Sequence, residues 1–231
     1  MQATIHKRDA SGTASEDQVE DHRSVAARRK RNAMRSRILQ TVMDVFSDRK
    51  NLSTTIEDVI RAADVSRGTF YKHFSSLEEA LTAVGREATD QMTLGILPVY
   101  DVLDDPVQRV STGMRVFLSR AVTDRRWARF VVRAELIPHE SVLLEYIYRD
   151  VRTGKAEAKM DFDDVTAAAD SIMGATVEGM RTILLERTPD TAAYIDAVIR
   201  ITLRGLGVDK RRAESATAFS LEHLAAHMSN R

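Results

Sequence analysis

Apolar residues recur at intervals of three and four along most of the chain, and no segment alternates with the period of two expected of a strand. Leu77, Leu81, Val84, Ala88 and Met92 share one stripe, which predicts a long helix that reaches toward Pro98. Further helices are expected over residues 107–122, 125–137, 140–153, 164–187, 190–206 and 210–228. The pattern therefore predicts an all-α fold.

The N-terminal part combines a polar lead-in with an amphipathic segment. Residues 1–24 are rich in Ser, Thr, Asp and Glu and poor in large apolar groups, so we expect a disordered arm. From about Val25 to Asp48, apolar residues at helical spacing predict a first helix; they include Ile38, Leu39, Val42, Met43, Val45 and Phe46.

Two short helices are expected next. Thr54 and Thr55 are both followed three residues later by an acidic residue, so either can cap a helix that carries Ile56. Ser66 can cap a second helix over about residues 67–73, and Asp64 tolerates the left-handed conformation that a tight turn between the two requires. Two short helices joined by a three-residue turn form a helix-turn-helix.

The second short helix has one apolar side and one polar side. Phe70 and Phe74 are expected to pack against the preceding helices. The residues left exposed are Arg67, Gly68, Thr69, Tyr71 and Lys72. Arginine can pair with guanine, the hydroxyl groups can reach phosphates or base edges, and glycine lets the backbone approach DNA closely. This surface is typical of DNA binding.

Charge strengthens this interpretation. The 231 residues carry no net charge, yet residues 1–75 hold 14 Lys and Arg against 10 Asp and Glu, and the remainder holds 20 against 24. Seven cations and no anion lie within residues 23–37, among them Arg28, Arg29, Lys30 and Arg31. Such a run is either a solvated helix face or a polyanion contact.

Other classes of protein are disfavoured by composition. The absence of cysteine excludes a disulfide framework and a thiolate nucleophile. The chain lacks both an apolar run of the roughly 20 residues that span a bilayer and the apolar core of a secretory signal. We therefore expect a cytoplasmic protein.

Residues 30–81 resemble the TetR family of one-component bacterial transcription regulators. The matching positions are Phe46, Thr54, Thr55, Asp58, Ala63, Val65, Ser66, Gly68, Thr69, Tyr71, His73, Phe74, Glu78 and Glu79. The resemblance implies that Thr55 and Tyr71 hold phosphates and that the second short helix lies in or beside the major groove. With the basic run, the DNA-contacting set becomes Arg28, Arg29, Lys30, Arg31, Thr54, Thr55, Ser66, Arg67, Gly68, Thr69, Tyr71, Lys72 and His73. Asp64 departs from the family, which usually has glycine in this turn.

The resemblance also implies the division of the chain. Residues 25–75 would bind DNA, and residues 76–231 would bind an effector and form a homodimer on a palindromic double-stranded operator, most simply as a repressor. The interface is expected to use small residues of the segment 165–185, namely Ala168, Ala169, Ile172, Ala175, Thr176, Gly179 and Ile183, with Tyr194, Val198, Ile201 and Gly205. The alternative is that these residues are ordinary core.

An effector pocket is expected among apolar and aromatic residues of the C-terminal part. The candidates are Met114, Phe117, Trp127, Phe130, Leu143, Tyr146, Ile147, Met173 and Met180. Sites in helical bundles lie between helices, and Met and aromatic side chains adapt to irregular apolar shapes. The same residues could equally fill a core.

Two alternatives belong to other functional classes. His223 and His227 have the spacing that can place two imidazoles on one metal, as in a metal-binding protein or enzyme. They provide only two ligands, and Glu222 precedes the first histidine, so the pattern H-E-x-x-H is absent. A module that binds RNA or acidic partners through its basic run is the other alternative. We expect a DNA-binding regulator that is not an enzyme and has no metal or cofactor.

Overall fold

The computed structural model describes residues 13–47, 54–134 and 142–228, and these ranges contain ten helices and no strand. The all-α prediction is confirmed. The helices are α1 (Thr13–Ser47), α2 (Ile56–Ala62), α3 (Arg67–Tyr71), α4 (Leu77–Tyr100), α5 (Pro106–Thr123), α6 (Arg125–Ala134), α7 (Val142–Ala156), α8 (Val165–Leu184), α9 (Thr191–Gly205) and α10 (Lys210–Met228). None of them is both long and apolar enough to cross a membrane.

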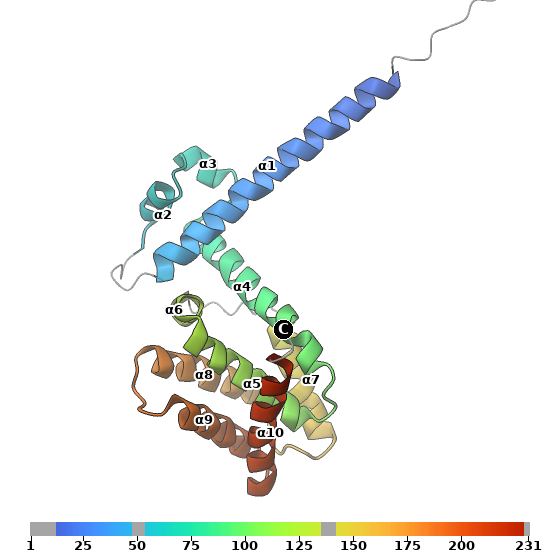
Figure 1. Cartoon of the computed structure of the whole chain (residues 1–231), viewed down its shortest axis with the longest axis vertical. Coiled ribbons are helices and arrows are strands. Elements are labelled where there is room, and N and C mark those ends of the chain that lie inside the picture. Colours follow the sequence, from blue (N-terminus) through green and yellow to red (C-terminus); the bar gives the residue numbers. More distant parts are fainter. Residues whose placement is uncertain (1–12, 48–53, 135–141, 229–231) are drawn as a thin grey trace, which may run out of the picture.

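Helices α1, α2 and α3 form the helix-turn-helix that the sequence predicts (Figure 1). Thr55 and Asp58 build a reciprocal cap at the start of α2, and Ser66 caps α3. Asp64 adopts the expected left-handed backbone, with φ of 49°. Phe70 and Phe74 are buried with Ile38 and Val42 of α1 and Val59 of α2, so α3 is fixed to the other two helices by its apolar side.

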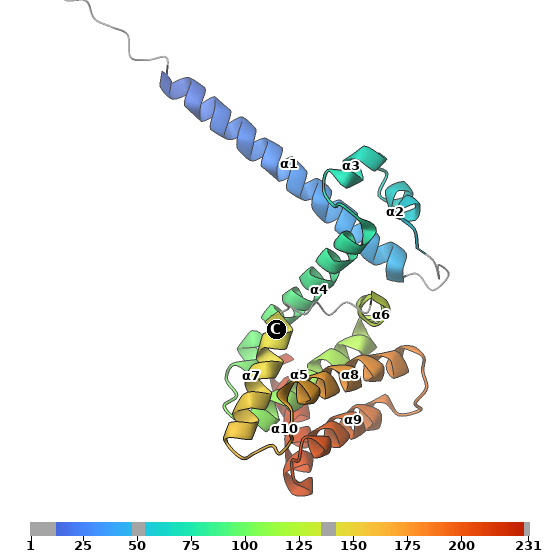
Figure 2. The same cartoon turned by 180° about the vertical axis from the view of Figure 1, so that it is seen from behind.

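Helix α1 begins earlier than predicted. It starts at Thr13, so residues 13–24, for which we expected a disordered arm, belong to this helix, while residues 1–12 lie outside the described chain. Polar composition argues against burial, but after Gly12 no glycine or proline interrupts this segment, and Ala, Glu, Gln and Arg are good helix formers. The N-terminal half of α1 projects away from the other helices (Figures 1 and 2).

Helix α4 joins the DNA-binding helices to the C-terminal helices, as predicted (Figure 2). A second connection is made by α6, which packs against α1. Arg126 of α6 forms an ion pair with Asp44 of α1, and the Ser47 hydroxyl donates to the Arg126 carbonyl at 3.1 Å. The two halves of the molecule are therefore joined at two places.

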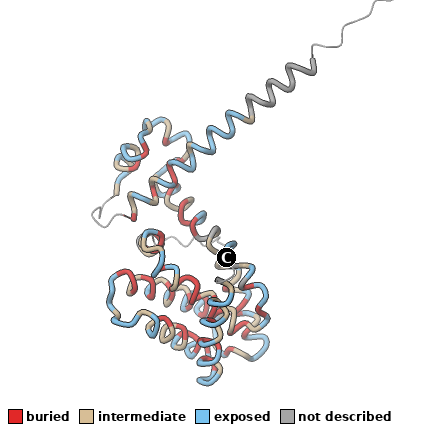
Figure 3. The backbone as a smooth tube through the Cα atoms, viewed as in Figure 1, coloured by how far each residue is buried: buried red, intermediate tan, exposed pale blue. Residues whose placement is uncertain are grey.

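The C-terminal helices surround α5, which packs against α6, α7, α8, α9 and α10. Figure 3 shows buried positions where these helices face one another and exposed positions along the outer sides. Pro106 occupies the first turn of α5, where its missing N–H costs nothing, and Asp105 caps the helix. Asp164 and Asp190 cap α8 and α9 in the same way. These local features explain why the helix boundaries could be predicted closely.

The small residues of α8 serve a different purpose from the predicted one. Ala168, Ala169, Ile172, Thr176, Gly179 and Ile183 are buried within the chain itself, so they cannot form the subunit interface. At Gly179 an added Cβ would lie 2.6 Å from a methyl carbon of Leu118, which shows that the missing side chain lets α5 approach α8 closely. The exposed positions of α8 include Ala167, Ser171, Gly174 and Glu178, while Ile201 and Gly205 of α9 are also exposed.

Candidate DNA interface and effector pocket

Helix α3 presents one side of the helix-turn-helix to solvent. The Ser66 hydroxyl accepts a hydrogen bond from the Thr69 amide at 3.0 Å and so determines where the helix begins. Phe70 faces the core, which leaves Arg67, Gly68, Tyr71 and Lys72 on the exposed side. Tyr71 is 49% exposed although it is a large aromatic residue. The predicted reading face is thus assembled in the structure.

Some of the predicted DNA-contacting groups already have partners in the free protein. Arg67 pairs with Glu57 of α2, and both side chains are exposed. The Thr69 and Ser66 hydroxyl oxygens lie 2.8 Å apart. The Thr55 hydroxyl donates to Asp58 Oδ2 at 2.8 Å, and the hydrogen bonds from Thr55 lower the pKa of Asp58. Arg67 must therefore exchange its carboxylate partner if it is to reach a base.

Thr54 and His73, like Thr69, are less exposed than the rest of the predicted set. The Thr54 hydroxyl oxygen is buried and has no hydrogen-bond partner within the described chain. His73 is half-buried. Direct contact between DNA and either side chain would therefore require a local movement.

Basic side chains on α1 extend the positive surface. Arg28, Arg29, Lys30 and Arg31 are exposed, and they lie on α1, within the helix expected from about Val25. Further along α1, the guanidinium of Arg35 lies 5.0 Å from the centre of the Phe74 ring. Such a helix can place several cations along a phosphate backbone.

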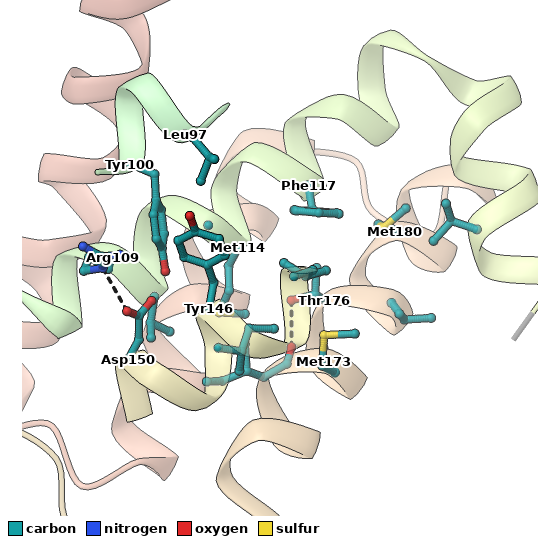
Figure 4. Close-up of a pocket in the computed structure, with 17 residues that line it drawn as sticks. Leu97, Tyr100, Arg109, Met114, Phe117, Tyr146, Asp150, Met173, Thr176 and Met180 are labelled. Atoms are coloured by element: carbon teal, nitrogen blue, oxygen red, sulfur yellow. Dashed lines mark hydrogen bonds and ion pairs between the residues drawn. The ribbon is translucent and has the colours of Figure 1, made fainter. Parts of the chain in front are cut away.

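A cavity lies among α4, α5, α6, α7 and α8 (Figure 4). Its volume is about 50 Å³. Apolar residues predominate in its lining, which consists of Leu97, Tyr100, Arg109, Val110, Gly113, Met114, Phe117, Val131, Leu143, Tyr146, Ile147, Asp150, Ile172, Met173, Thr176, Val177 and Met180. In Figure 4, Arg109 and Asp150 lie at one end of the cavity and Met180 at the other.

The polar end of the cavity is built on an ion pair. Arg109 Nε donates to Asp150 Oδ1 at 2.8 Å, and Arg109 Nη1 donates to the Leu103 carbonyl at 2.9 Å. The guanidinium also lies over the Tyr100 ring, 4.4 Å from its centre. Asp150 is only 2% exposed. Burial raises the pKa of Asp150 and lowers that of Arg109, because both charged forms lose hydration, and the direct contact between the two groups opposes both shifts.

This ion pair is not fully satisfied. Asp150 Oδ2 and Arg109 Nη2 are buried and have no hydrogen-bond partner within the described chain. One is an acceptor when the carboxyl is ionised and the other is a donor. Both residues line the cavity, so its polar end offers a complementary pair of groups that lack hydrogen bonds, although Asp101 Oδ1 lies 3.8 Å from Arg109 Nη2.

Seven of the nine predicted pocket residues line this cavity: Met114, Phe117, Leu143, Tyr146, Ile147, Met173 and Met180. Trp127 and Phe130 are buried in the core and do not line it. Since each residue of a helix is rotated about 100° from the last, Val131 is the residue of α6 that reaches the cavity.

The charged end was missed, although a signal existed in the sequence. Leu143, Tyr146, Ile147 and Asp150 follow the spacing of three and four that marks one helix face, so an acidic residue continues an apolar stripe. An aspartate at a core position is unusual and requires a partner. That Arg109 would be this partner could not be read from the sequence.

The histidine pair has a local structural role. His227 Nδ1 lies 2.8 Å from the His223 carbonyl oxygen, and the His223 ring stacks on Phe219. Within the described residues, no group of three or more His, Cys, Asp or Glu side chains could hold a metal ion. The structure therefore offers no support for the metal-binding alternative.

Comparison with known proteins extends this description. A family model for "Bacterial regulatory proteins, tetR family" matches residues 38–84. A second, for the "Tetracyclin repressor-like, C-terminal domain", matches residues 105–218. The two matches cover the helix-turn-helix and most of the helices that surround the cavity.

Individual relatives are more distant. The HTH-type transcriptional regulator TcmR of Streptomyces glaucescens is 32% identical over 93 residues, which are 40% of this chain and 40% of that protein. The HTH-type transcriptional repressor KstR2 of Mycolicibacterium smegmatis is 26% identical over 129 residues, 56% of this chain and 62% of that protein. The match thus spans less than two thirds of either relative.

The whole fold also has solved counterparts. The crystal structure of RolR with the ligand resorcinol superimposes with a TM-score of 0.62 and 21% identity, over 82% of this chain and 95% of that one. At this identity the likeness is one of fold.

Proposed function

The chain belongs to the TetR family of transcriptional regulators, which bind DNA, respond to ligands and are not enzymes, and we propose that it represses transcription by binding a palindromic operator as a homodimer. In this proposal residues 25–75 bind DNA and residues 76–231 bind the effector and form the dimer. The observation that carries it is the exposed side of α3, where Arg67, Tyr71 and Lys72 surround a glycine.

Dimerisation follows from the geometry of DNA. A single short helix reads few bases, and paired recognition helices must lie about 34 to 36 Å apart, or a multiple of that, to enter successive major grooves. The exposed sides of α8 and α9 support an interface there: Ile201 is 71% exposed although it is a large apolar residue, and the small residues Gly205 of α9 and Gly174 of α8 are exposed as well. We propose this outer surface in place of the buried stripe.

Effector control is supported by the cavity and its position. Tyr100 of α4 and Val131 of α6 both line it, and α4 and α6 are the two helices that connect the cavity to the DNA-binding helices. A ligand that displaced either side chain would change the placement of α3. Release of the operator by a small, largely apolar effector is the response that we propose.

The proposal is tested first by selecting bound duplexes from a random pool and measuring affinity for the selected site and for unrelated duplex. If Arg67 reads a base, Arg67→Ala should cost about 1 to 3 kcal/mol on the selected site and much less on random DNA. Tyr71→Phe should weaken both kinds of DNA alike, because phosphates carry no sequence information.

Arg61→Ala is the matched control, since Arg61 is an exposed arginine of α2 that pairs with Asp58 outside the reading face. It should change neither affinity by much. Equal losses on both kinds of DNA for Arg67→Ala would contradict base reading. A reporter gene placed behind the selected site should rise in expression when the protein is removed, and a fall would contradict repression.

A further inference from the structure

The polar end of the cavity has hydrogen-bonding capacity that the protein does not use. Asp150 Oδ2 and Arg109 Nη2 are buried and have no hydrogen-bond partner among the described residues, whereas buried polar groups in folded proteins are nearly always hydrogen-bonded. A carboxylate oxygen, Asp101 Oδ1, lies 3.8 Å from Nη2, beyond hydrogen-bond distance. Asp150 contacts Arg109 through its other oxygen, and both residues line the cavity. An incoming molecule is therefore offered one acceptor and one donor at a single place.

We propose that the effector is a small neutral compound with an apolar body and a hydroxyl group, and that this hydroxyl binds Asp150 Oδ2. The inference rests on the proposed effector-binding function and adds the chemical class of the ligand. A hydroxyl group is both a donor and an acceptor, so it can donate to Asp150 Oδ2 and accept from Arg109 Nη2.

Charged head groups fit this end poorly. The charge of Arg109 is already compensated by Asp150, and Asp101 lies 3.8 Å from Arg109. A carboxylate would add a further negative charge beside Asp150 in an apolar surrounding, where it would lose its hydration without gaining a free cation. An ammonium group would meet Arg109 and also Arg149, whose Nε lies 3.7 Å from Asp150 Oδ1. A neutral hydroxyl avoids both penalties.

The rest of the cavity determines the body of the ligand. Phe117, Val131, Met173 and Met180 line the part away from the ion pair, and they offer dispersion contacts and no hydrogen bonds beyond a weak thioether acceptor. The cavity volume of about 50 Å³ is below the roughly 150 Å³ of a cavity that holds benzene, so a ligand of one ring must widen it. Methionine side chains can move to admit somewhat larger bodies.

The test compares phenol, toluene and benzoate, which share one ring and differ in the attached group. Calorimetric titration of each compound into the full-length protein at neutral pH should give a dissociation constant for phenol at least tenfold below that for toluene. Benzoate should bind more weakly than phenol. Equal affinity for phenol and toluene would overturn the inference, because solvent would then satisfy the ion pair as well as a ligand does. Tighter binding of benzoate would also overturn it.

Two variants test the role of the ion pair. In the double variant Arg109→Met with Asp150→Leu, apolar side chains of similar size replace the pair, a change that folded proteins often tolerate. Its preference for phenol over toluene should be lost or reversed. Asp150→Asn keeps the shape and replaces the free acceptor by an amide, and the preference should fall severalfold. A preference that survives in both variants would contradict the assignment to Asp150.

A matched control is available in the same domain. Arg115 is a buried arginine that pairs with Asp196 outside the cavity, so Asp196→Asn perturbs a buried pair without touching the site. Its ratio of phenol to toluene affinity should equal that of the unchanged protein. If none of the three compounds binds while operator binding is intact, the effector pocket itself is refuted. If the compounds bind but phenol is not preferred over toluene, only the assignment of a hydroxyl group to Asp150 is refuted.

Discussion

Gly68 lies on the exposed side of α3, and an added Cβ would meet only the Ser66 hydroxyl oxygen, at 3.9 Å. The fold therefore has room for a side chain at this position. Glycine in a helix costs about 0.5 to 1 kcal/mol relative to alanine, so folding alone would favour alanine. We propose that the DNA approaches the backbone closely at Gly68, so that DNA binding and not folding requires the glycine.

We expect Gly68→Ala to leave the free energy of unfolding unchanged or to raise it by up to about 1 kcal/mol. Operator affinity should fall tenfold or more, because the methyl group would occupy space needed by the DNA. Chemical denaturation and fluorescence anisotropy measure the two quantities. Gly95→Ala is the control: that helical glycine of α4 is also exposed, with nothing within 4 Å of an added Cβ, so DNA binding should not change. Undiminished operator affinity for Gly68→Ala would show that DNA does not approach Gly68 closely.

Residues whose roles depend on near neighbours were predictable. The caps at Thr55 and Ser66 involve partners three residues away, and Asp64 needed only its own tolerance of positive φ. The partners of Arg67 and Asp150 were not predictable. Arg109 and Asp150 are 41 residues apart in sequence, so their contact depends on how α5 and α7 pack.

At the scale of elements, α1 differs most from its prediction. Among its residues 25–47, whose burial the structure describes, the first fully buried one is Ile38, with Met34 partly buried before it. At about 1.5 Å per residue, the part that precedes Met34 is roughly 30 Å long. A helix holds Arg28, Arg29, Lys30 and Arg31 at defined positions, whereas a flexible arm would lose entropy to place them. The basic run can therefore contribute to DNA binding at less cost.

Replacing Arg28, Arg29, Lys30 and Arg31 together by Gln should preserve the helix, since glutamine has a similar helix propensity. Affinity for the operator and for random duplex should both fall. The slope of log affinity against log salt should decrease by about 0.9 for each phosphate contact that is lost. Arg211→Gln, which alters an exposed cation of α10, should leave the slope unchanged. An unchanged slope in the quadruple variant would exclude contacts between this run and phosphate.

The start of a helix was predictable where a capping residue or a proline close in sequence marks it. Pro106 and the caps Asp105, Asp164 and Asp190 mark the starts of three helices. The helix against which an element packs was less predictable. Small residues of α8 permit close helix packing, but the sequence does not say whether the partner is α5 of the same chain or a helix of a second subunit. Leu118 against Gly179 decides this in favour of α5.

At the scale of the whole molecule, we propose that the cavity and the reading helix are coupled through α4 and α6, which both contact α1. Coupling free energies of about 1 to 3 kcal/mol correspond to roughly 5- to 150-fold in affinity, and the effect is reciprocal. Operator DNA must therefore weaken effector binding by the factor by which the effector weakens DNA binding. The pair formed by Asp44 and Arg126 is a place at which this coupling can be altered without touching either site.

We expect phenol to bind the free dimer more tightly than the operator-bound dimer. The factor should equal the one by which phenol weakens operator binding. Trp127 fluorescence can report binding, because its ring lies 5.9 Å from that of Phe117 in the cavity wall. Asp44→Asn should reduce the factor, since it weakens the contact of α1 with α6. Arg152→Gln on the outer side of α7 should not reduce it. Identical phenol affinities with and without operator would refute phenol as an effector.

The double connection between the two halves also limits how the DNA-binding helices can move. A body attached at one point can swing in any direction, whereas a body attached at two points can turn only about the line that joins them. We expect a ligand that shifts α6 through Val131 to move the contact at Asp44 and to turn the DNA-binding helices about their attachment to α4. We therefore expect α3 to rotate, so that its angular phase around the DNA axis changes and not merely its distance from the second subunit.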